Sequence, residues 1–340
     1  MSHRVFFGVL RALTLLVIGW LGGWIALATN PDPTAVRTAG TNATSLLLDA
    51  PARAAVANTF LDLVRIKGVS GEEQVIRDAL RLRLIALGAT NVPLKAIGSN
   101  VPANLALVIP ATGSFTHQPG ILLNAHIDTI VVSTPEHLAF DPGTGDFHHA
   151  HEGDPSAISS FGGDDRSGVA VIVGALEFLH TRHWSQGRGH RRIVVLFTAD
   201  EERGCVGAKY LSRQQPELFQ DLEISLSIDG PLDLQTGYPA ESLVTVVPAK
   251  LTEIAPYRRA LRQLDDYCTR AGLKSRRTEV GLGMGDFAYF PAKARAQMHL
   301  RSPVRGWHNR ERVKVQDLIT HTDLLASMLL DWDRPSPTQP

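Results

Sequence analysis

The sequence predicts an α/β fold in which a mostly parallel central sheet carries helices on both faces. Short apolar runs, as found in strands that are buried on both sides, alternate along the chain with longer segments of helical periodicity. This alternation is typical of βα units joined into one parallel sheet. A length of 340 residues and a hydrophobic content of 44% are sufficient for a single large domain with a sizeable core.

Each element is placed by its apolar pattern and by the residues at its ends. Ser70 and Glu73 have the spacing of a capping box, which predicts a helix that runs to about Leu87 and stops at Gly88. The helix that begins near Gly168 is apolar nearly all round, so it should be buried. Strands are expected near residues 104–109, 121–127, 193–198 and 224–228, and further helices near residues 52–66, 168–181, 206–213, 253–271 and 315–331.

Residues 1–30 are predicted to be a targeting segment rather than part of the fold. A basic start precedes an apolar stretch, and Ala26-Leu27-Ala28 fits the small-x-small pattern of signal-peptidase cleavage. The apolar stretch falls just short of the ~20 residues that span a membrane, so a cleaved signal peptide and a retained membrane anchor are both kept as alternatives. Either one exports the folded domain, to the periplasm or the outer face of the cytoplasmic membrane, and contacts the membrane only through this segment.

The rest of the chain divides into three parts. Residues 31–50 are polar and contain Pro and Gly, which predicts a flexible linker. Residues 51–332 hold the expected helices and strands and form the folded domain. Residues 333–340 are expected to be a disordered tail.

Composition excludes some classes of partner and of cross-link. The formal net charge is zero and no stripe of Lys and Arg stands out, so nucleic acid is not expected as a partner. Cys205 and Cys268 are the only cysteines, which rules out a disulfide framework. Whether these two residues bond to each other in an oxidising compartment is left open.

Three consecutive acids, Asp200, Glu201 and Glu202, follow the apolar run from Ile193 to Phe197. Carboxylates at the C-terminal end of such a strand lie where open α/β sheets bind their ligands. Because adjacent like charges repel each other, a site that holds them together usually contains a cation. Taken alone, the motif would be better explained as a solvated acidic turn.

Four other segments supply the remaining parts of a metal site. The apolar run ILLNAHIDTI contains His126 and Asp128, whose side chains leave the same face of a strand because they are two residues apart. A Gly-rich turn holds Asp164 ahead of the buried helix, a third apolar run ends at Asp229, and a late loop holds His308. Each residue alone has an ordinary interpretation as a core histidine, an acidic turn or a helix cap. Together they predict a metal site.

The order H-x-D, D-D, E-E, D, H resembles that of the co-catalytic zinc exopeptidases of the MH clan. This clan includes peptidase T, the glutamate carboxypeptidases and the bacterial leucyl aminopeptidases. The stretches LVRIKGVSGEEQVIRDALRLRLIALGATNV and IGSNVPANLALVIPATG are similar to the opening of a peptidase T-type domain. The resemblance covers roughly residues 52–330 and implies a single phosphorylase/hydrolase-like zinc exopeptidase domain.

Carried over position by position, the resemblance gives each site residue a role. Glu201 would be the general base, and Asp128 would orient His126. The Asp164-Asp165 peptide bond would be cis, a geometry that costs about 3–4 kcal/mol without proline. The ligands would divide between two zinc ions, with His126 and Asp229 on one, Glu202 and His308 on the other, and Asp164 bridging both.

These residue types suit the chemistry of two divalent cations. Asp164, Glu202 and Asp229 neutralise most of the positive charge, and the surplus favours a bridging hydroxide as the nucleophile at neutral pH. Imidazole and carboxylate ligands without thiolate suit Zn²⁺, although Co²⁺ or Mn²⁺ would also fit. Glu201 cannot readily bind the same ion as its neighbour, so it is free to pass a proton from the attacking water to the leaving amine.

The chain departs from the peptidase T pattern between Asp229 and His308. Peptidase T and the related carboxypeptidases carry a lid or dimerisation domain there, but a separate domain needs at least ~50 residues and residues 230–307 already hold other elements. The spacing is closer to that of the single-domain leucyl aminopeptidases, and GMGDFAYF resembles their S-D-x-x-x-F element, with Asp286 and Phe290 near the pocket. We therefore expect an aminopeptidase for a peptide or small amide substrate, without a lid-mediated dimer.

Residues 132–161 form a long segment rich in Gly, Pro and His between two of the expected ligands. We expect an irregular loop, which either borders the mouth of the active site as a lid or is simply solvated. Its HHAH stretch offers a further weak metal site that no other feature supports.

Two other classes of function stay open. One is different amide chemistry on the same scaffold, such as N-acyl amino acid deacylation, carboxypeptidase action or single-metal glutaminyl cyclisation, of which the complete ligand set disfavours the last. The other is a non-catalytic, peptidase-like binding ectodomain, although such domains typically lose ligands. Metal content and hydrolysis of a panel of aminoacyl anilides would separate these alternatives. The preferred substrate side chain cannot be deduced from the sequence.

Overall fold

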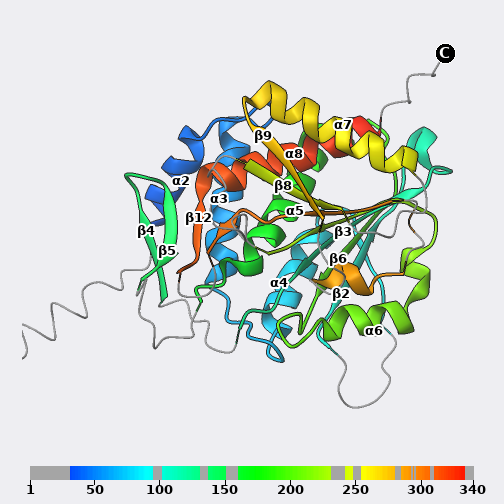
Figure 1. Cartoon of the computed structure of the whole chain (residues 1–340), viewed down its shortest axis with the longest axis horizontal. Coiled ribbons are helices and arrows are strands. Elements are labelled where there is room, and N and C mark those ends of the chain that lie inside the picture. Colours follow the sequence, from blue (N-terminus) through cyan, green and yellow to red (C-terminus); the bar gives the residue numbers. More distant parts are fainter. Residues whose placement is uncertain are drawn as a thin grey trace, which may run out of the picture.

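The computed structural model describes residues 31–94, 102–130, 137–150, 160–230, 242–247, 254–279, 285–291, 294, 296–306 and 310–333. Within these residues it confirms the expected α/β fold, with a central sheet that carries helices on both faces (Figure 1). The strands of this sheet lie in the order β1 (Thr90–Asn91), β2 (Leu105–Ile109), β6 (Ile193–Thr198), β3 (Gly120–His126), β7 (Leu222–Ile228), β10 (Ala296–Leu300), β8 (Ser242–Val247) and β9 (Lys274–Glu279).

Strand β3 lies inside the sheet and determines where polar side chains converge. It pairs in parallel with β6 on one side and with β7 on the other, and β10 pairs in parallel with β7. Strands β1, β2 and β8 contribute the antiparallel pairs. The carboxyl ends of the four parallel strands β3, β6, β7 and β10 therefore meet at one edge of the sheet, as in other open α/β sheets.

Helices pack on the two faces of the sheet unequally. Six of them contribute to the larger core on one face, while α6 and the short 3-10 helix η5 (Asp286–Tyr289) cover the other face over a smaller core. Helix α5 is buried along most of its length, as its apolar sequence predicts. The helices of the described residues are α2 (Pro33–Asn42), α3 (Ala50–Val64), α4 (Gln74–Ile85), α5 (Gly163–Arg182), α6 (Val206–Gln214), α7 (Ile254–Ala271) and α8 (Val315–Trp332).

The expectation of a flexible linker over residues 31–50 is wrong for most of that segment. Helix α2 forms there, with the Asp32 carboxylate accepting the Thr34 N–H at 2.9 Å and Pro33 at the first helical position. Val36 is fully buried, and Gly40 lies so close to α3 that a Cβ there would be tightly crowded. The cap and the buried face make the segment part of the folded domain, packed against α3 and α8.

The predicted targeting segment, residues 1–30, lies outside the described residues, as do residues 334–340 of the expected tail. No helix in the described part of the chain is both long enough and apolar enough to cross a membrane.

The expected irregular loop over residues 132–161 is partly regular. Strands β4 (Leu138–Asp141) and β5 (Asp146–His149) form a hairpin that joins β12 (Arg312–Lys314) and β11 (Val304–Arg305) in a second small sheet. Phe147 fixes the hairpin to the domain, because its ring packs edge-on against Phe60 with centroids 5.0 Å apart. Residues 131–136 and 151–159, including His151 of the HHAH stretch, lie outside the described residues.

Candidate metal centre

His126, the last residue of β3, lies at the centre of a group of buried acids. Its Nε2 is 3.5 Å from Asp164 Oδ1 and 3.5 Å from Asp229 Oδ1. Asp229 directly follows β7, so the two neighbouring parallel strands deliver one ligand each. One ligand atom from each of these three residues lies within 4.8 Å of the others, which is the geometry of a site that can hold a cation.

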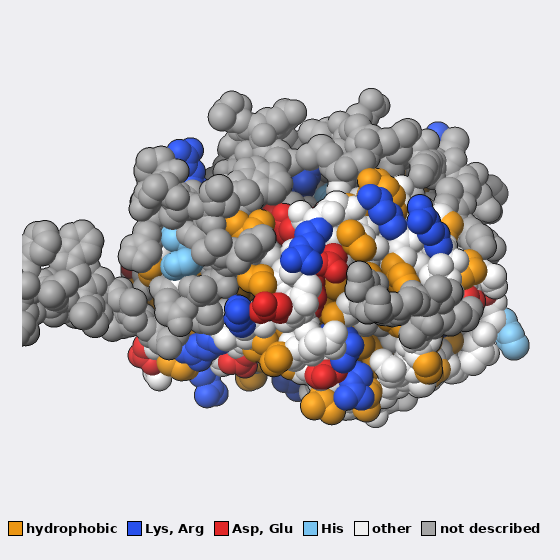
Figure 2. Space-filling model, turned by 90° about the horizontal axis from the view of Figure 1, so that it is seen from below, with side chains coloured by type: hydrophobic (Ala, Val, Ile, Leu, Met, Phe, Trp, Pro, Cys, Tyr) orange, Lys and Arg blue, Asp and Glu red, His pale blue; other side chains and the backbone are white. Residues whose placement is uncertain are grey.

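The acidic pair after β6 approaches His126 as well. Glu201 Oε2 lies 4.0 Å from His126 Nε2. His126, Glu201 and Glu202 form a second group whose ligand atoms lie within 4.8 Å of one another. Both groups share the imidazole of His126. The structure therefore brings together five of the predicted site residues: His126, Asp164, Glu201, Glu202 and Asp229. Seen from below (Figure 2), Asp and Glu side chains gather near the middle of the molecule among Lys and Arg side chains.

Asp164 and Asp165 begin α5 with non-helical backbone angles. The peptide bond between them is cis, as the resemblance implied. Asp164 is 5% exposed, and its Oδ1 has no hydrogen-bond partner among the described residues. Asp165 is directed elsewhere, because its Oδ1 accepts the Gly168 N–H at 3.1 Å within the first turn of α5. Of this pair, Asp164 belongs to the group of ligand atoms around His126.

His308 lies outside the described residues. Its role as a ligand therefore stays a prediction. The two cysteines are free thiols, both buried, and the Cys205 thiol donates to Glu201 Oε1 at 3.3 Å.

Asp128 contacts His126, but its carboxylate mainly holds the acidic loop. His126 Nδ1 lies 3.0 Å from the backbone carbonyl oxygen of Asp128 and 3.4 Å from its Oδ1. The carboxylate accepts the Glu201 N–H at 2.9 Å on Oδ1 and the Glu202 N–H at 3.1 Å on Oδ2. Asp128 therefore orients the imidazole chiefly through its carbonyl and fixes the backbone of the acidic pair through its side chain.

The capping box expected at Ser70 and Glu73 is wrong. Glu73 itself is the residue before α4, and no side chain caps that helix. The Ser70 hydroxyl instead donates to Asp128 Oδ2 at 2.7 Å, and Glu73 Oε1 accepts the N–H groups of Gly71 at 2.8 Å and of Asp200 at 3.2 Å. Both side chains therefore support the residues that carry the site rather than the helix.

Burial and like charge shape the electrostatics of the site. Burial raises the pKa of Glu201 to about 8 and that of Glu202 to about 8. Burial opposes the charged form of His126, but the carboxylates of Asp128, Asp164 and Asp229 raise the pKa of the imidazole well above its usual value. A bound cation would offset this surplus of buried acids.

Several supporting residues were not predicted from the sequence. Buried Glu311 accepts the Ser160 hydroxyl at 2.7 Å and the Gly163 N–H at 2.9 Å, both on Oε2, and so fixes the turn before Asp164. The signal in the sequence that could have identified Glu311 was its position three residues after the predicted ligand His308.

Arg166 and Asn104 brace the backbone around the site. The Arg166 guanidinium is buried and donates to the carbonyl oxygens of Leu63, Ile66 and Gly68. Asn104 accepts the Ala199 N–H at 2.9 Å and donates to the Gly207 carbonyl at 3.1 Å. These two bonds connect the two ends of the acidic loop. No sequence pattern marks either role, because both depend on tertiary contacts.

Asp286 lies beside the site, as expected, whereas Phe290 belongs to the core. Asp286 accepts a hydrogen bond from the Thr198 hydroxyl and groups with Glu201 and Cys205 within 4.8 Å. The Phe290 ring is buried against Phe219, with centroids 5.1 Å apart.

Comparison with known proteins agrees with this fold. The model of Peptidase family M28 matches residues 104–312. A tripeptidase from Staphylococcus aureus subsp. aureus Mu50 superposes with a TM-score of 0.60 and 17% identity over 83% of this chain and 98% of its own. Aminopeptidase PepT from Bacillus cereus ATCC 10987 gives a TM-score of 0.60 and 14% identity over 81% and 97%.

A third solved structure, LapB from Legionella pneumophila, gives a TM-score of 0.58 and 15% identity over 82% of this chain and 71% of its own. At these identities the likeness concerns the fold. No curated protein sequence matches the chain.

Proposed function

Because this chain belongs to peptidase family M28 and is a metallo-exopeptidase, we propose that it uses two bound zinc ions to remove N-terminal residues from peptides. The observation that carries this proposal is the convergence of His126, Asp164 and Asp229 from three separate elements. The unpartnered, buried Oδ1 of Asp164 fits a metal ligand, because a buried carboxylate oxygen without a hydrogen bond needs another positive partner.

The proposal assigns the residues to two ions. His126 and Asp229 would hold one ion, Glu202 and His308 would hold the other, and Asp164 would serve both. Imidazole and carboxylate donors suit zinc, and Co²⁺ or Mn²⁺ would be tolerated. When bound, two such ions polarise the scissile carbonyl and supply an ionised water at neutral pH.

The residues of the chain then complete the reaction. Glu201 accepts a proton from the attacking water and delivers it to the nitrogen of the leaving amine. Asp128 keeps Glu201 in place through the backbone bond at 2.9 Å, and its carbonyl holds the imidazole of His126. Because Glu201 lies within 4.0 Å of His126 Nε2, it is near enough to the metal ligands for a short proton transfer.

The structure of the region between Asp229 and residue 307 supports a preference for the N-terminus of the substrate. The described parts of this region place β8, β9 and β10 in the central sheet and pack α7 against α8, rather than forming a separate lid. The described parts of this region therefore supply no lid that could bind a substrate carboxylate. The alternatives are another amide hydrolase, such as an N-acyl amino acid deacylase or a carboxypeptidase, and a non-catalytic binding ectodomain.

Export is the second part of the proposal and rests on the apolar segment within residues 1–30. Fractionation of cells that express the full chain tests it, with the protein expected in the periplasm or on the outer face of the membrane. Recovery from the cytosol alone would contradict export.

A single experiment separates the aminopeptidase from the two alternatives. Protein purified from residue 31 onward is measured for metal content and for hydrolysis of Leu-, Met- and Glu-p-nitroanilide, their N-acetylated forms and N-acetyl dipeptides. We expect about two zinc ions per chain and cleavage only of substrates with a free amino group. Cleavage of the acetylated substrates would favour a deacylase or carboxypeptidase, and full metal loading without hydrolysis would favour a binding domain.

A further inference from the structure

Arg301 lies next to the proposed metal ligand Asp229 on the neighbouring strand. Strands β7 and β10 are paired in parallel up to Ile228 and Leu300. The next residue on each strand is therefore Asp229 and Arg301, and the Asp229 N–H donates to the Leu300 carbonyl at 3.0 Å. The register thus places a cationic side chain at the same edge of the sheet as the acidic site.

The side chains of Asp229 and Arg301 also lie on the same face of the sheet. Along β10, His299 contacts Phe287 of η5, with ring centroids 4.7 Å apart. Side chains two residues apart on a strand share a face, so Arg301 lies on the η5 side. Ser227 donates to Asn124 on β3, and Asn124 and His126 share a face by the same spacing. Asp229 follows Ser227 on that face, directed towards His126.

Arg301 is buried without a matching anion. The residue is 6% exposed, and its Nη1 lies so close to Gly230 that a Cβ there would overlap it. Within the described residues, no carboxylate lies at ion-pair distance from its guanidinium, and Asp229 and Asp164 act on it only from further away. Buried arginines are almost always paired. Arg166, by contrast, donates to three carbonyl groups.

A simpler role would be to offset the surplus acidic charge of the site. Arg301 is less needed for that role once the site holds cations, because the bound cations then neutralise the carboxylates of Asp229 and Asp164. Arg301 would in that state lie beside further positive charge, and the free energy of this arrangement would be lowered by an anion from outside the chain.

We propose that Arg301 forms an anion subsite that binds a carboxylate of the peptide substrate. The proposal rests on the peptidase function and specifies its substrate class. A planar guanidinium binds a carboxylate through two parallel hydrogen bonds, which fixes both position and orientation. The carboxylate belongs either to an acidic N-terminal side chain or to the C-terminus of a short peptide, and these two sources are distinguishable.

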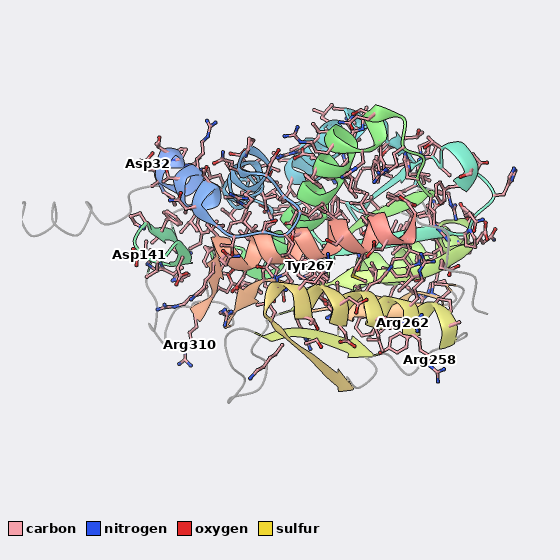
Figure 3. The ribbon with its side chains drawn as sticks, turned by 90° about the horizontal axis from the view of Figure 1, so that it is seen from above. Asp32, Asp141, Arg258, Arg262, Tyr267 and Arg310 are labelled. Atoms are coloured by element: carbon pink, nitrogen blue, oxygen red, sulfur yellow. The ribbon has the colours of Figure 1, made fainter. Side chains whose placement is uncertain are left out.

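The test compares Arg301→Gln with Arg301→Lys in zinc-loaded enzyme. Arg258→Gln on the outer side of α7 (Figure 3) is the matched control for loss of one positive charge. Substrates come in pairs that differ only in charge: Glu-p-nitroanilide against Gln-p-nitroanilide, and Leu-Gly against Leu-Gly amide. We expect Arg301→Gln to lower the preference for the charged member by roughly tenfold to a hundredfold, mainly through KM, with Arg301→Lys between.

Loss confined to the anilide pair would identify the side-chain carboxylate, and loss confined to the dipeptide pair would identify the C-terminus. Equal loss on all four substrates, together with reduced zinc content, would overturn the proposal in favour of a counterion role. Unchanged preference in Arg301→Gln would also overturn it. If the wild-type enzyme cleaves none of the four, the peptidase function fails separately. Calorimetric binding of glutamate against glutamine, and of Leu-Gly against its amide, to wild-type and Arg301→Gln protein then decides the role of Arg301.

Discussion

The carboxylate of Asp128 accepts the backbone N–H of Glu201 at 2.9 Å, which joins the end of β3 to the loop that follows β6. The same carboxylate accepts the Glu202 N–H at 3.1 Å and the Ser70 hydroxyl at 2.7 Å. Its backbone carbonyl lies 3.0 Å from His126 Nδ1. A single residue therefore sets the positions of an imidazole ligand and of the acidic pair relative to each other.

Asp128→Asn should weaken metal binding by about 10–100-fold, the usual effect of losing a residue that orients metal ligands. An asparagine amide nitrogen would face one of the two N–H groups that the carboxylate now accepts, so the acidic loop would shift. Zinc affinity, measured by competition with a chromophoric chelator, checks this. Ser70→Ala is the control, because it removes one hydrogen bond and leaves both backbone bonds in place, and it should cause a smaller loss. Equal affinity in Asp128→Asn and wild type would contradict the positioning role.

Glu201→Gln and Glu202→Gln should differ in kind. Glu201→Gln should keep the metals and lose about 10²–10⁴-fold in kcat, because it removes the general base. Glu202→Gln should lower the metal content instead, because an amide oxygen is a much weaker ligand than a carboxylate.

Metal analysis and turnover measured on the same preparations separate the two effects. Loss of metal in Glu201→Gln with full loading of Glu202→Gln would reverse the two assignments.

The sequence was sufficient for the parts of the site that follow strand ends. His126, the acidic pair and Asp229 each follow an apolar run, and parallel pairing of β3 with β6 and β7 brings those ends together. Local pattern and fold class agree there, which makes such residues predictable.

Other features depend on contacts that no local pattern encodes. Ser70 and Glu73 match a capping box, but tertiary hydrogen bonds to Asp128 and to the Asp200 N–H replace the capping bonds. The role proposed for Arg301 was not predicted, because it depends on the register that places Arg301 beside Asp229 across two strands far apart in sequence.

Zinc binding should release protons and strengthen as pH rises from 6 to 8. In the metal-free site, burial raises the pKa values of Glu201 and Glu202 to about 8, so both are largely protonated at pH 6. Glu202 must lose its proton to bind a cation, and a bound cation also favours the ionised form of Glu201 beside it, so affinity is lost as pH falls through about 8 and levels off above it. Calorimetric titration in two buffers of different ionisation enthalpy measures the protons released. Equal heats in both buffers at pH 6.5 would contradict the linkage.

The N-terminal arm, formed by α2 and residues 43–49, should depend on Asp323 of α8 for its stability. This buried carboxylate accepts hydrogen bonds from the segment that leads into α3 and from Tyr267 of α7, which lies against α8 (Figure 3). The donors are the Ser45 hydroxyl at 2.6 Å, the N–H groups of Leu46 at 2.9 Å, Leu47 at 2.9 Å and Leu48 at 3.0 Å, and the Tyr267 hydroxyl at 2.9 Å.

Tyr267→Phe should lower the free energy of unfolding by about 1.5–3 kcal/mol, the range for a hydrogen bond to a charged group. Asp323→Asn should cost more, because its amide nitrogen would face N–H groups such as that of Leu46, for which the described residues offer no second acceptor. Urea unfolding measures both, and Tyr289→Phe, on a partly exposed ring, is the control that should change little. Limited proteolysis localises the effect: cleavage within α2 and residues 43–49 should accelerate in Asp323→Asn before the rest of the domain unfolds, because these bonds hold the arm to α8. Uniform cleavage across the domain would show instead that Asp323 stabilises the whole core and not the arm.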